Sequence, residues 1–237
     1  MDYQQIFKRH EIKYLLSMQE KEFILEAIKP YMQPGQYGYS TIRNVYFDTD
    51  TFCLIRHSLE KPVYKEKLRL RSYRAAKGED NVFVELKKKY KSVVYKRRLV
   101  LTESQAWECF QKDIPLPSSS QIANEIEYFR DFYKPLYPKV FISYSREAYE
   151  MIDGSDFRVT FDRNILYRQE DFSFASGIYG TPILNEGETL MEIKTPGAIP
   201  LWLCRKLTEM QIFKTSFSKY GLAYQDIFKN GGGLKYA

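Results

Sequence analysis

Residues 68–74 read LRLRSYR and alternate between apolar and polar side chains, in the period-two pattern of a half-buried strand. In such a strand the leucines share one face, and Arg69 and Arg71 share the other, because successive side chains point to opposite sides. Both arginines are permanently charged. The face opposite the leucines is therefore either a solvent-exposed surface or the inner wall of a site that holds anions.

The same alternation recurs along the chain, and in most strand-like segments the polar face carries Lys or Arg. The side chains that share a face in these segments are Arg9, Glu11 and Lys13; Glu85, Lys87 and Lys89; Lys96 and Arg98; Tyr144 and Arg146; Arg158, Thr160 and Asp162; and Glu192 and Lys194. One charged face by itself is typical of the solvent side of an antiparallel sheet. Repetition over so many strands favours a barrel whose charged faces point inward and line a wet tunnel. A polyanion must then fill the tunnel to offset the repulsion, and phosphate oxygens suit both Arg and Lys.

The pattern as a whole predicts an α+β fold, an antiparallel β-barrel tunnel of about eight strands flanked by helices. We predict strands at 6–14, 40–48, 62–74, 81–90, 93–101, 138–150, 156–164 and 189–195, and helices at 18–32, 103–112, 119–134, 199–213 and 218–229. We expect a single domain over residues 1–237, with its core at about 6–228 and a flexible Gly-rich tail at 229–237.

Composition limits the classes of partner and cofactor. Lys and Arg number 36 against 30 Asp and Glu, an excess that permits a nucleic acid, a membrane surface or a polyanion as partner. The three cysteines are far apart, and the two histidines are too few for a His/Cys zinc site, so any metal should be a hard cation on carboxylates. The chain has no apolar run of membrane-spanning length and no signal peptide, so we expect a cytoplasmic protein without a transmembrane segment.

Several familiar motifs are missing from the sequence. It has no GxxxxGK[ST] loop and no GxGxxG, so side chains rather than a Gly-rich backbone loop should hold phosphates. No Ser/His/Asp or Cys/His arrangement is visible. The basic residues alternate within strands and do not cluster with exposed aromatic residues, so we do not expect nucleic acid as a ligand. Cations with a few carboxylates suit phosphoryl transfer by positioning and charge neutralisation.

The ordered set of motifs resembles a known family. FKRHEIKYL, NVYFDTD, KLRLRSY, VFVELKKKY, VYKRRLVL, SYSREAY, RVTFDRNI, LMEIKTP and FSKYGLAY, which run from about residue 6 to 228, resemble the VTC domain. This is the polyphosphate polymerase domain of the vacuolar transporter chaperone complex, in the CYTH/triphosphate tunnel superfamily. The resemblance implies an antiparallel tunnel that transfers the γ-phosphate of ATP to a growing polyphosphate chain, with Mn²⁺ or Mg²⁺ as cofactor. Polyphosphate, inorganic phosphate or pyrophosphate would serve as primer.

The resemblance also implies roles for individual residues. The expected catalytic residues are Arg69, Arg71, Lys87, Arg158 and Glu192, and Glu192 matches the metal-binding glutamate of the family. The expected substrate-binding residues are Lys13, Lys96, Arg98, Tyr144, Arg146, Lys194, Ser218 and Lys219, of which the last two match a helix end that closes over the triphosphate. Each of these side chains could instead be part of an ion pair in the tunnel wall that does not contact substrate.

Two departures from the family pattern bear on function. Other members carry an N-terminal regulatory domain and membrane helices, so this chain is expected to act as a separate catalytic domain. Its regulation and any polymer translocation would then depend on another chain, such as a membrane protein that holds it at the inner face of a membrane. Hydrolytic relatives begin with Glu-x-Glu-x-Lys, whereas this chain reads Arg9-x-Glu11-x-Lys13. Loss of a carboxylate weakens a second metal site and water activation, which favours a polymerase over a triphosphatase. A triphosphatase and an inactive polyphosphate-binding module remain the alternatives.

Overall fold

The computed structural model describes residues 10–91 and 93–230, and within them one antiparallel sheet carries all ten strands. The strands are β1 (His10–Leu16), β2 (Met32–Asp48), β3 (Tyr64–Ser72), β4 (Asn81–Tyr90), β5 (Val93–Thr102), β6 (Tyr137–Met151), β7 (Arg158–Arg168), β8 (Thr181–Pro182), β9 (Thr189–Thr195) and β10 (Lys214–Thr215). The helices are α1 (Met18–Ile28), α2 (Cys53–Leu59), α3 (Glu103–Gln111), α4 (Gln121–Phe132), α5 (Leu201–Glu209) and α6 (Lys219–Asn230). The strand order is β10-β1-β9-β7-β6-β2-β3-β4-β5, with β8 paired to β7.

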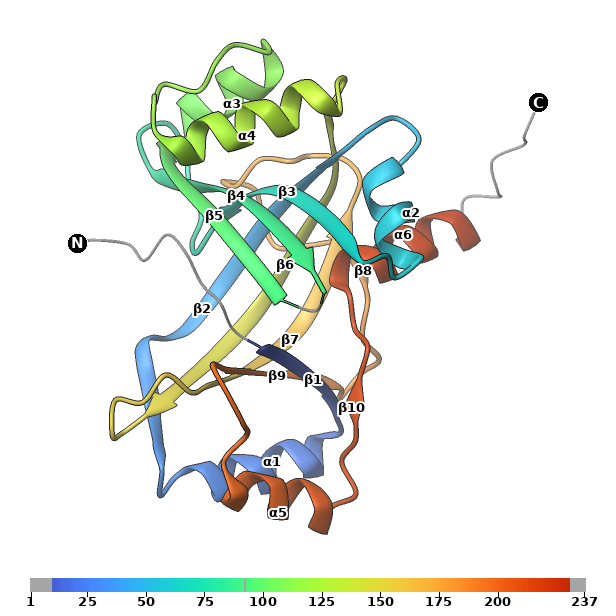
Figure 1. Ribbon diagram of the computed structural model, residues 1–237. Coiled ribbons are helices and arrows are strands. Elements are labelled where there is room, and N and C mark those ends of the chain that lie inside the picture. The colour runs from blue at the N-terminus through green and yellow to red at the C-terminus, as the bar shows by residue number, and fades with distance from the viewer. Residues whose placement is uncertain (1–9, 92, 231–237) are drawn as a thin grey trace.

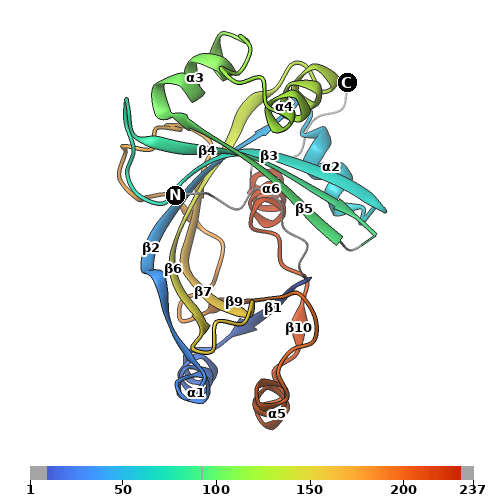
Figure 2. The ribbon, with the colours of Figure 1, turned by 60° about the vertical axis from the view of Figure 1, so that its left-hand side comes forward.

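The sheet curls into a tunnel-type fold, as predicted. In Figure 2 the long strands β2, β6 and β7 form a side wall, with β3, β4 and β5 above and β1 and β9 below. The barrel is not closed by hydrogen bonds, because β5 and β10 end the strand order without pairing to each other in the described ranges. Side chains bridge the gap instead. Lys87 Nζ on β4 lies 2.8 Å from Glu11 Oε2 on β1, which shows that the upper and lower parts of the sheet face each other.

The predicted elements are largely confirmed, with differences that have local causes. The eight predicted strands match the eight longer strands, although residues 6–9 of the first lie outside the described residues. β8 and β10 have two residues each, too few for a periodic signal. The first helix ends at Ile28 and not at residue 32, since Pro30 has no N–H to continue the helical bonding. β2 begins eight residues before the predicted strand and pairs with β6 through an irregularity between Pro34 and Tyr39.

The outer face of the sheet is covered by helices, and this confirms which way the LRLRSYR leucines point. Leu68 and Leu70 are fully buried in a cluster that includes Ala106 of α3 and Ile126 of α4. Figure 1 shows α3 and α4 above β4 and β5, and α1 and α5 below β1 and β9. The arginines of the same strand must therefore face the inside of the tunnel.

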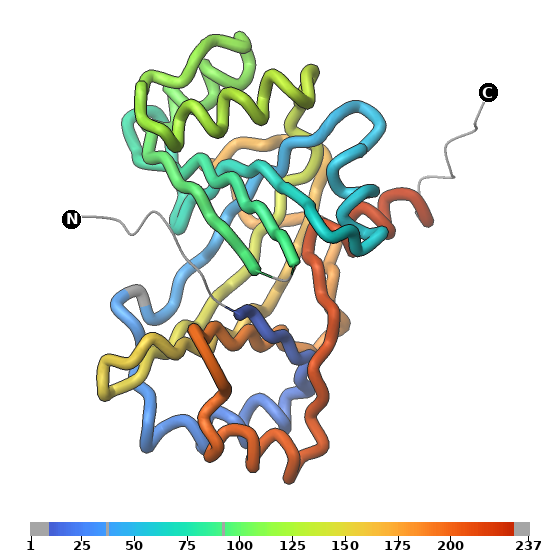
Figure 3. Tube along the Cα trace, viewed as in Figure 1, coloured from blue at the N-terminus to red at the C-terminus, as the bar shows by residue number. Residues whose placement is uncertain are grey.

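The unpredicted helix α2 lies beside α6, and both are attached to the end of β2 (Figure 3). The buried carboxylate of Asp48 accepts hydrogen bonds from the backbone N–H groups of Leu54 and Ile55 at the start of α2. It also accepts one from the hydroxyl of Tyr220 in α6, at 3.0 Å. One carboxylate therefore holds the start of each helix, and α6 brings Lys219 to the tunnel. None of the helices in the described part is long and apolar enough to cross a membrane.

The orientation of the leucines can be tested by a change in stability. Leu70→Ala removes a fully buried side chain and should lower the free energy of unfolding by about 2–5 kcal/mol. Urea denaturation followed by circular dichroism measures this loss. Val63, just before β3, is 63% exposed, and Val63→Ala should change stability by less than about 0.5 kcal/mol. Equal effects of the two substitutions would contradict the inside-outside assignment of β3.

Candidate functional site

A cavity of about 1740 Å³ runs along the inner face of the sheet. All of the predicted site residues line it: Lys13, Arg69, Arg71, Lys87, Lys96, Arg98, Tyr144, Arg146, Arg158, Glu192, Lys194, Ser218 and Lys219. They come from β1, β3, β4, β5, β6, β7, β9 and the start of α6. The sheet thus gathers side chains that are far apart in sequence around one volume, although their roles remain predictions.

The upper wall is organised around Glu85, whose carboxylate is fully buried. Strand register places Arg69, Glu85 and Arg98 in one row across β3, β4 and β5. Arg69 donates from Nε and Nη2 to Glu85 Oε2 at 2.9 and 2.7 Å, and Arg98 donates from Nε and Nη2 to Oε1 at 2.9 and 2.6 Å. Lys96 Nζ and Arg71 Nε each lie 3.6 Å from this carboxylate. We call these five residues the Glu85 cluster.

The Glu85 cluster holds more positive than negative charge. Against the penalty of burial, the surrounding cations lower the pKa of Glu85 well below its usual value, with Arg71 and Arg69 contributing most. Its single negative charge cannot balance two bidentate arginines, a third arginine and a lysine. The other contacts of these guanidinium groups are to neutral oxygens, which add no negative charge. Tyr46 and Tyr73 accept from Arg69 and Arg98 at 2.9 and 2.8 Å and help to fix the two arginines in place.

The next row of the same three strands consists of lysines only. Register pairs Lys67 of β3 with Lys87 of β4, and Lys87 with Lys96 of β5. Like charges directly opposite each other on a sheet are unfavourable. Burial and then the charges of Lys87, Lys13, Lys65 and Arg69 lower the pKa of Lys67 to about 7. Burial likewise lowers the pKa of Lys96 to about 7, despite the nearby Glu85. The row itself contains no acidic residue, and its countercharge comes from outside the row, from Glu11 on Lys87 and from Glu85 on Lys96.

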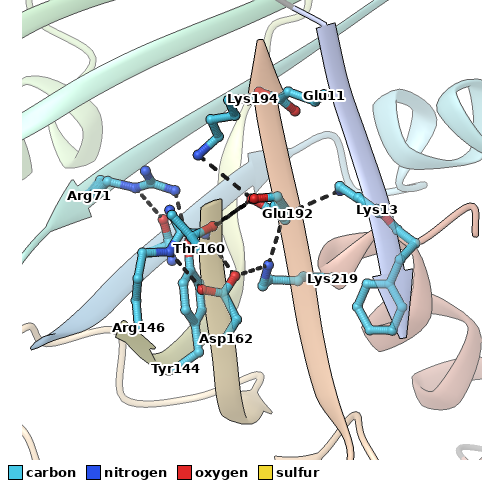
Figure 4. Close-up of polar contacts among 12 residues, drawn as sticks. Glu11, Lys13, Arg71, Tyr144, Arg146, Thr160, Asp162, Glu192, Lys194 and Lys219 are labelled. Atoms are coloured by element: carbon cyan, nitrogen blue, oxygen red, sulfur yellow. Dashed lines mark hydrogen bonds and ion pairs between the residues drawn. The ribbon is translucent and has the colours of Figure 1, made fainter. Parts of the chain in front are cut away.

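The lower wall is organised around two acidic residues, Glu192 and Asp162, shown in Figure 4. Glu192 Oε1 lies 3.3 Å from Lys219 Nζ and 3.5 Å from Lys13 Nζ. Its Oε2 lies 3.1 Å from Arg146 Nη2 and 3.8 Å from Lys194 Nζ. Asp162 accepts from Nε and Nη2 of Arg146 at 2.6 and 2.7 Å, and Lys219 Nζ is 2.6 Å from its Oδ2. We call these six residues the Glu192 cluster.

The ion pairs of the Glu192 cluster fix its protonation states. Nearby cations outweigh burial and lower the pKa of Glu192 well below its usual value, and Arg146 and Lys219 lower that of Asp162. The pKa of Lys219 is raised because these two carboxylates outweigh the effect of its burial. Both acids are therefore ionised and, with cations on their oxygens, are weak bases. Four cations against two carboxylates again leave an excess of positive charge.

Three further predicted residues make contacts between elements on opposite sides of the cavity, and one of them, Tyr144, contacts both clusters. The hydroxyl of Tyr144 accepts from Arg71 Nη2 at 3.2 Å, and the ammonium of Lys219 lies 4.5 Å from the centre of its ring. Lys87 forms its ion pair with Glu11, and this contact is the main cause that lowers the pKa of Glu11 to about 2. The hydroxyl of Ser218 accepts from Lys67 at 3.1 Å. The remaining predicted residue, Arg158, is exposed at the rim of the cavity.

The sequence analysis did not assign a site role to several residues that the structure places there. Glu85 and Asp162 were recognised only as neighbours on charged faces, yet each is fully buried at the centre of an ion-pair network. Lys67 precedes Arg69 by two residues, so the period-two rule already placed it on the same face. Tyr46 and Asn44, which accept from Arg69 and Arg71, gave no sequence signal because uncharged polar residues are common in strands.

The carboxylates of the cavity do not form a metal site by themselves. Within 10–91 and 93–230, no group of three or more His, Cys, Asp or Glu side chains is arranged to hold a metal ion. Both oxygens of Glu192 already face cations. Mg²⁺ is commonly held by one or two carboxylates together with water and substrate phosphates. Glu192 therefore fits a metal that binds together with a phosphate ligand. The phosphate oxygens would draw the neighbouring ammonium groups away from the carboxylate.

Comparison with solved structures identifies the fold. The chain is similar to a candidate adenylate cyclase from Bacillus halodurans, with a TM-score of 0.57 and 18% sequence identity over 91% of this chain and 96% of that one. It is also similar to a candidate adenylyl cyclase from Hippeastrum that is described as having a dominant triphosphatase activity. There the TM-score is 0.55 and the identity 18%, over 97% of this chain and 98% of that one. At this identity the likeness shows a shared triphosphate-tunnel fold.

Comparison of the sequence with curated proteins found no match. Comparison with family models found a match to the model of the VTC domain, which covers residues 8–228. The matched range includes both acid-centred clusters, the lysine row between them and the α6 end that carries Ser218 and Lys219. This chain belongs to the VTC domain family.

Proposed function

We propose that this protein is an ATP-dependent polyphosphate polymerase that transfers the γ-phosphate of ATP to the end of a polyphosphate chain inside the tunnel. One observation carries the proposal. Among the carboxylates that contact the predicted phosphate-binding cations, Glu85, Asp162 and Glu192 are each held by two or more cations. Glu11 is paired with Lys87, and this contact lowers its pKa to about 2. These carboxylates are too weakly basic to activate water, whereas a phosphate acceptor is already anionic and needs no general base.

We expect cations of the two walls to contact the phosphate chain from opposite sides. Arg71 of the Glu85 cluster donates to Asn44 Oδ1 at 2.8 Å and to Tyr144, whose ring lies next to Lys219 of the Glu192 cluster. We expect Arg71 to contact a phosphate that spans the two clusters. Arg69 and Arg98 of the upper wall, and Lys13 and Lys219 of the lower wall, offer charges on opposite sides of such a phosphate. Fixed cations around a transferring phosphoryl group stabilise the charge that develops on its oxygens. Lys87 and Arg158 would extend this contact toward the cavity rim.

A divalent ion, Mn²⁺ or Mg²⁺, is the cofactor that this site would take. Glu192 would be its protein ligand, with phosphate oxygens as the others. When bound, the ion would supply charge neutralisation on the phosphates. Lys13, Arg146, Lys194 and Lys219 would then exchange their contact with Glu192 for contact with phosphate oxygens.

The polymerase proposal predicts both products of the transfer. Incubation of the protein with ATP, pyrophosphate primer and Mn²⁺ should give a ladder of polyphosphate on a gel together with stoichiometric ADP. Arg71→Ala should lower kcat/KM by about 10²–10³-fold, because it removes a fixed cation from the transferring phosphate. Arg205→Ala is the matched control, since Arg205 is an exposed residue of α5 outside the cavity lining.

Two other results would reject polymerase activity. Release of inorganic phosphate without polymer would indicate a triphosphatase, the activity described for the Hippeastrum protein. Tight binding of polyphosphate with no turnover of ATP under either metal would indicate a binding module.

The countercharge role of Glu85 can be tested without any turnover. Glu85→Gln leaves the cations of its cluster buried without their carboxylate, and should lower the free energy of unfolding by about 3–5 kcal/mol in phosphate-free buffer. Added tripolyphosphate should restore much of this loss, so the rise in Tm should be larger in the variant than in wild type. Glu26→Gln, which breaks an exposed pair with Lys29, should change little. A variant that tripolyphosphate fails to rescue would contradict anion binding at this wall.

The lysine row predicts that phosphate binding depends on pH. The empty protein loses the proton of Lys67 near pH 7, below the ordinary value of 10.5. A bound phosphate favours the ammonium form and raises this pKa, so binding takes up a proton and weakens as pH rises above 7. The Kd of the wild-type protein for tripolyphosphate should rise about 10-fold or more between pH 7 and pH 9. The rise should be smaller in Lys67→Arg, because the arginine stays charged over this range.

Calorimetry in two buffers of different ionisation enthalpy would count the protons taken up at pH 8. A wild-type protein and a Lys67→Arg variant with the same pH dependence would contradict the assignment of this proton to Lys67.

A further inference from the structure

The outer face of the sheet contains a buried arginine that the tunnel does not use. Arg43 lies on β2 between Asn44, whose side chain contacts Arg71 in the tunnel, and Ile42. Val45 and Phe47, two and four residues further on, belong to the outer core with Leu70, so Arg43 points to that side as well. It is 9% exposed. A guanidinium stays charged in proteins, so burial at this position requires acceptors.

The described residues supply no acceptor to the buried Nε of Arg43. Three buried side-chain atoms of the described structure lack a hydrogen-bond partner, and two of them are Arg43 Nε and Ser143 Oγ. These two residues are direct neighbours, because Arg43 pairs with Ser143 in the register of β2 and β6. On its other side Arg43 pairs with Ser72 of β3, whose hydroxyl is already bonded to the carbonyl of Arg74. An unpartnered donor group and an unpartnered hydroxyl therefore lie side by side on one face.

The charge around this pair is positive. Among the described residues no carboxylate lies within ion-pair distance of Arg43. The nearest charged group that affects it is Arg168 of β7, and burial together with the charge of Arg168 lowers the pKa of Arg43. Arg168 stacks 3.7 Å above the ring of Phe141, donates to the backbone carbonyl of Asp171 at 2.8 Å, and has its Nη2 3.7 Å from the carboxylate of Asp171. A water molecule could bond to Arg43 and Ser143, but it would leave the charge of Arg43 without a counterion.

We propose that Arg43 and Ser143 form a binding site for a small oxyanion of the size of orthophosphate, on the face of the sheet turned away from the tunnel. The guanidinium offers several N–H donors in a plane, and the hydroxyl of Ser143 adds one donor beside it. A tetrahedral oxyanion presents acceptor oxygens in more than one direction and can accept from both residues. Arg168 adds a favourable charge without contacting the anion, since its own donors face backbone carbonyls.

This site is separate from the tunnel, although the two share strands. Asn44 and Tyr144 follow Arg43 and Ser143 in sequence and point the opposite way, toward Arg71. Inorganic phosphate could therefore bind on the outer face while a polyphosphate occupies the inner face. The proposal does not depend on polymerase activity, because its readout is the binding of phosphate.

Thermal unfolding tests the proposal. The protein is first saturated with tripolyphosphate to fill the tunnel, and inorganic phosphate is then added at constant ionic strength against a chloride control. Phosphate should raise the Tm of wild type further, and Arg43→Met should weaken phosphate binding at least ten-fold, with a smaller loss in Ser143→Ala. In phosphate-free buffer Arg43→Met should be at least as stable as wild type, because it removes an uncompensated buried charge. Arg205→Met, at an exposed position on α5, is the matched control and should respond as wild type does.

Crystals soaked in selenate provide an independent readout by anomalous scattering. A peak next to Arg43 and Ser143 in wild type that disappears in Arg43→Met would support the site. Three results would overturn the proposal. The crystals could show nothing but an ordered water at this position, or an adventitious ion only, which would be present equally in Arg43→Met. Alternatively, phosphate could raise the Tm of Arg43→Met as much as that of wild type.

Discussion

The upper wall of the tunnel depends on the row Arg69–Glu85–Arg98, in which one buried carboxylate holds two arginines across three strands. Without Glu85 the strands would bring together cations that repel one another in a medium of low polarity. With it, each arginine has a fixed position, and only part of its donor set is used. The same carboxylate therefore stabilises the wall and leaves it positively charged, which is the condition that an anion-binding tunnel must satisfy.

The lower wall uses the same principle with a different arrangement. Glu192 and Asp162 share Arg146 and Lys219, so the acids and cations form a network rather than separate pairs. When a phosphate enters between the walls, several cations can exchange their contact with a carboxylate for a contact with the phosphate. The total number of charge pairs then rises, because neither cluster has enough acid to match its cations. Lys67 gains the most, since its contact is with the neutral hydroxyl of Ser218, whereas Lys87 and Lys96 already face Glu11 and Glu85.

The period-two pattern was sufficient to predict which face enters the tunnel in the seven strands whose polar face is charged, but it assigned no face to the strand at 40–48. It placed Arg69 and Arg71 opposite Leu68 and Leu70, and helices α3 and α4 cover the leucines as expected. Strand register could not be read from the sequence, because it depends on long-range pairing and on irregularities such as that between Pro34 and Tyr39. For this reason Glu85 was seen only as a member of a charged face and Lys67 was not singled out, whereas their rows, and hence the opposite electrostatic character of the two rows, appeared only in the structure.

Because successive side chains of a strand point to opposite faces, one strand can carry residues of two different sites. On β2, Asn44 faces the tunnel and fixes Arg71, and its neighbour Arg43 faces the outer core without an acidic partner among the described residues. A residue buried on the outer face is normally apolar, as Val45 and Phe47 are, so a charged side chain at this position is costly unless something compensates it. Strand β6 repeats the arrangement with Tyr144 inside and Ser143 outside. Because the polar exception occurs on both strands at the same point of the register, packing of the outer core alone does not account for it.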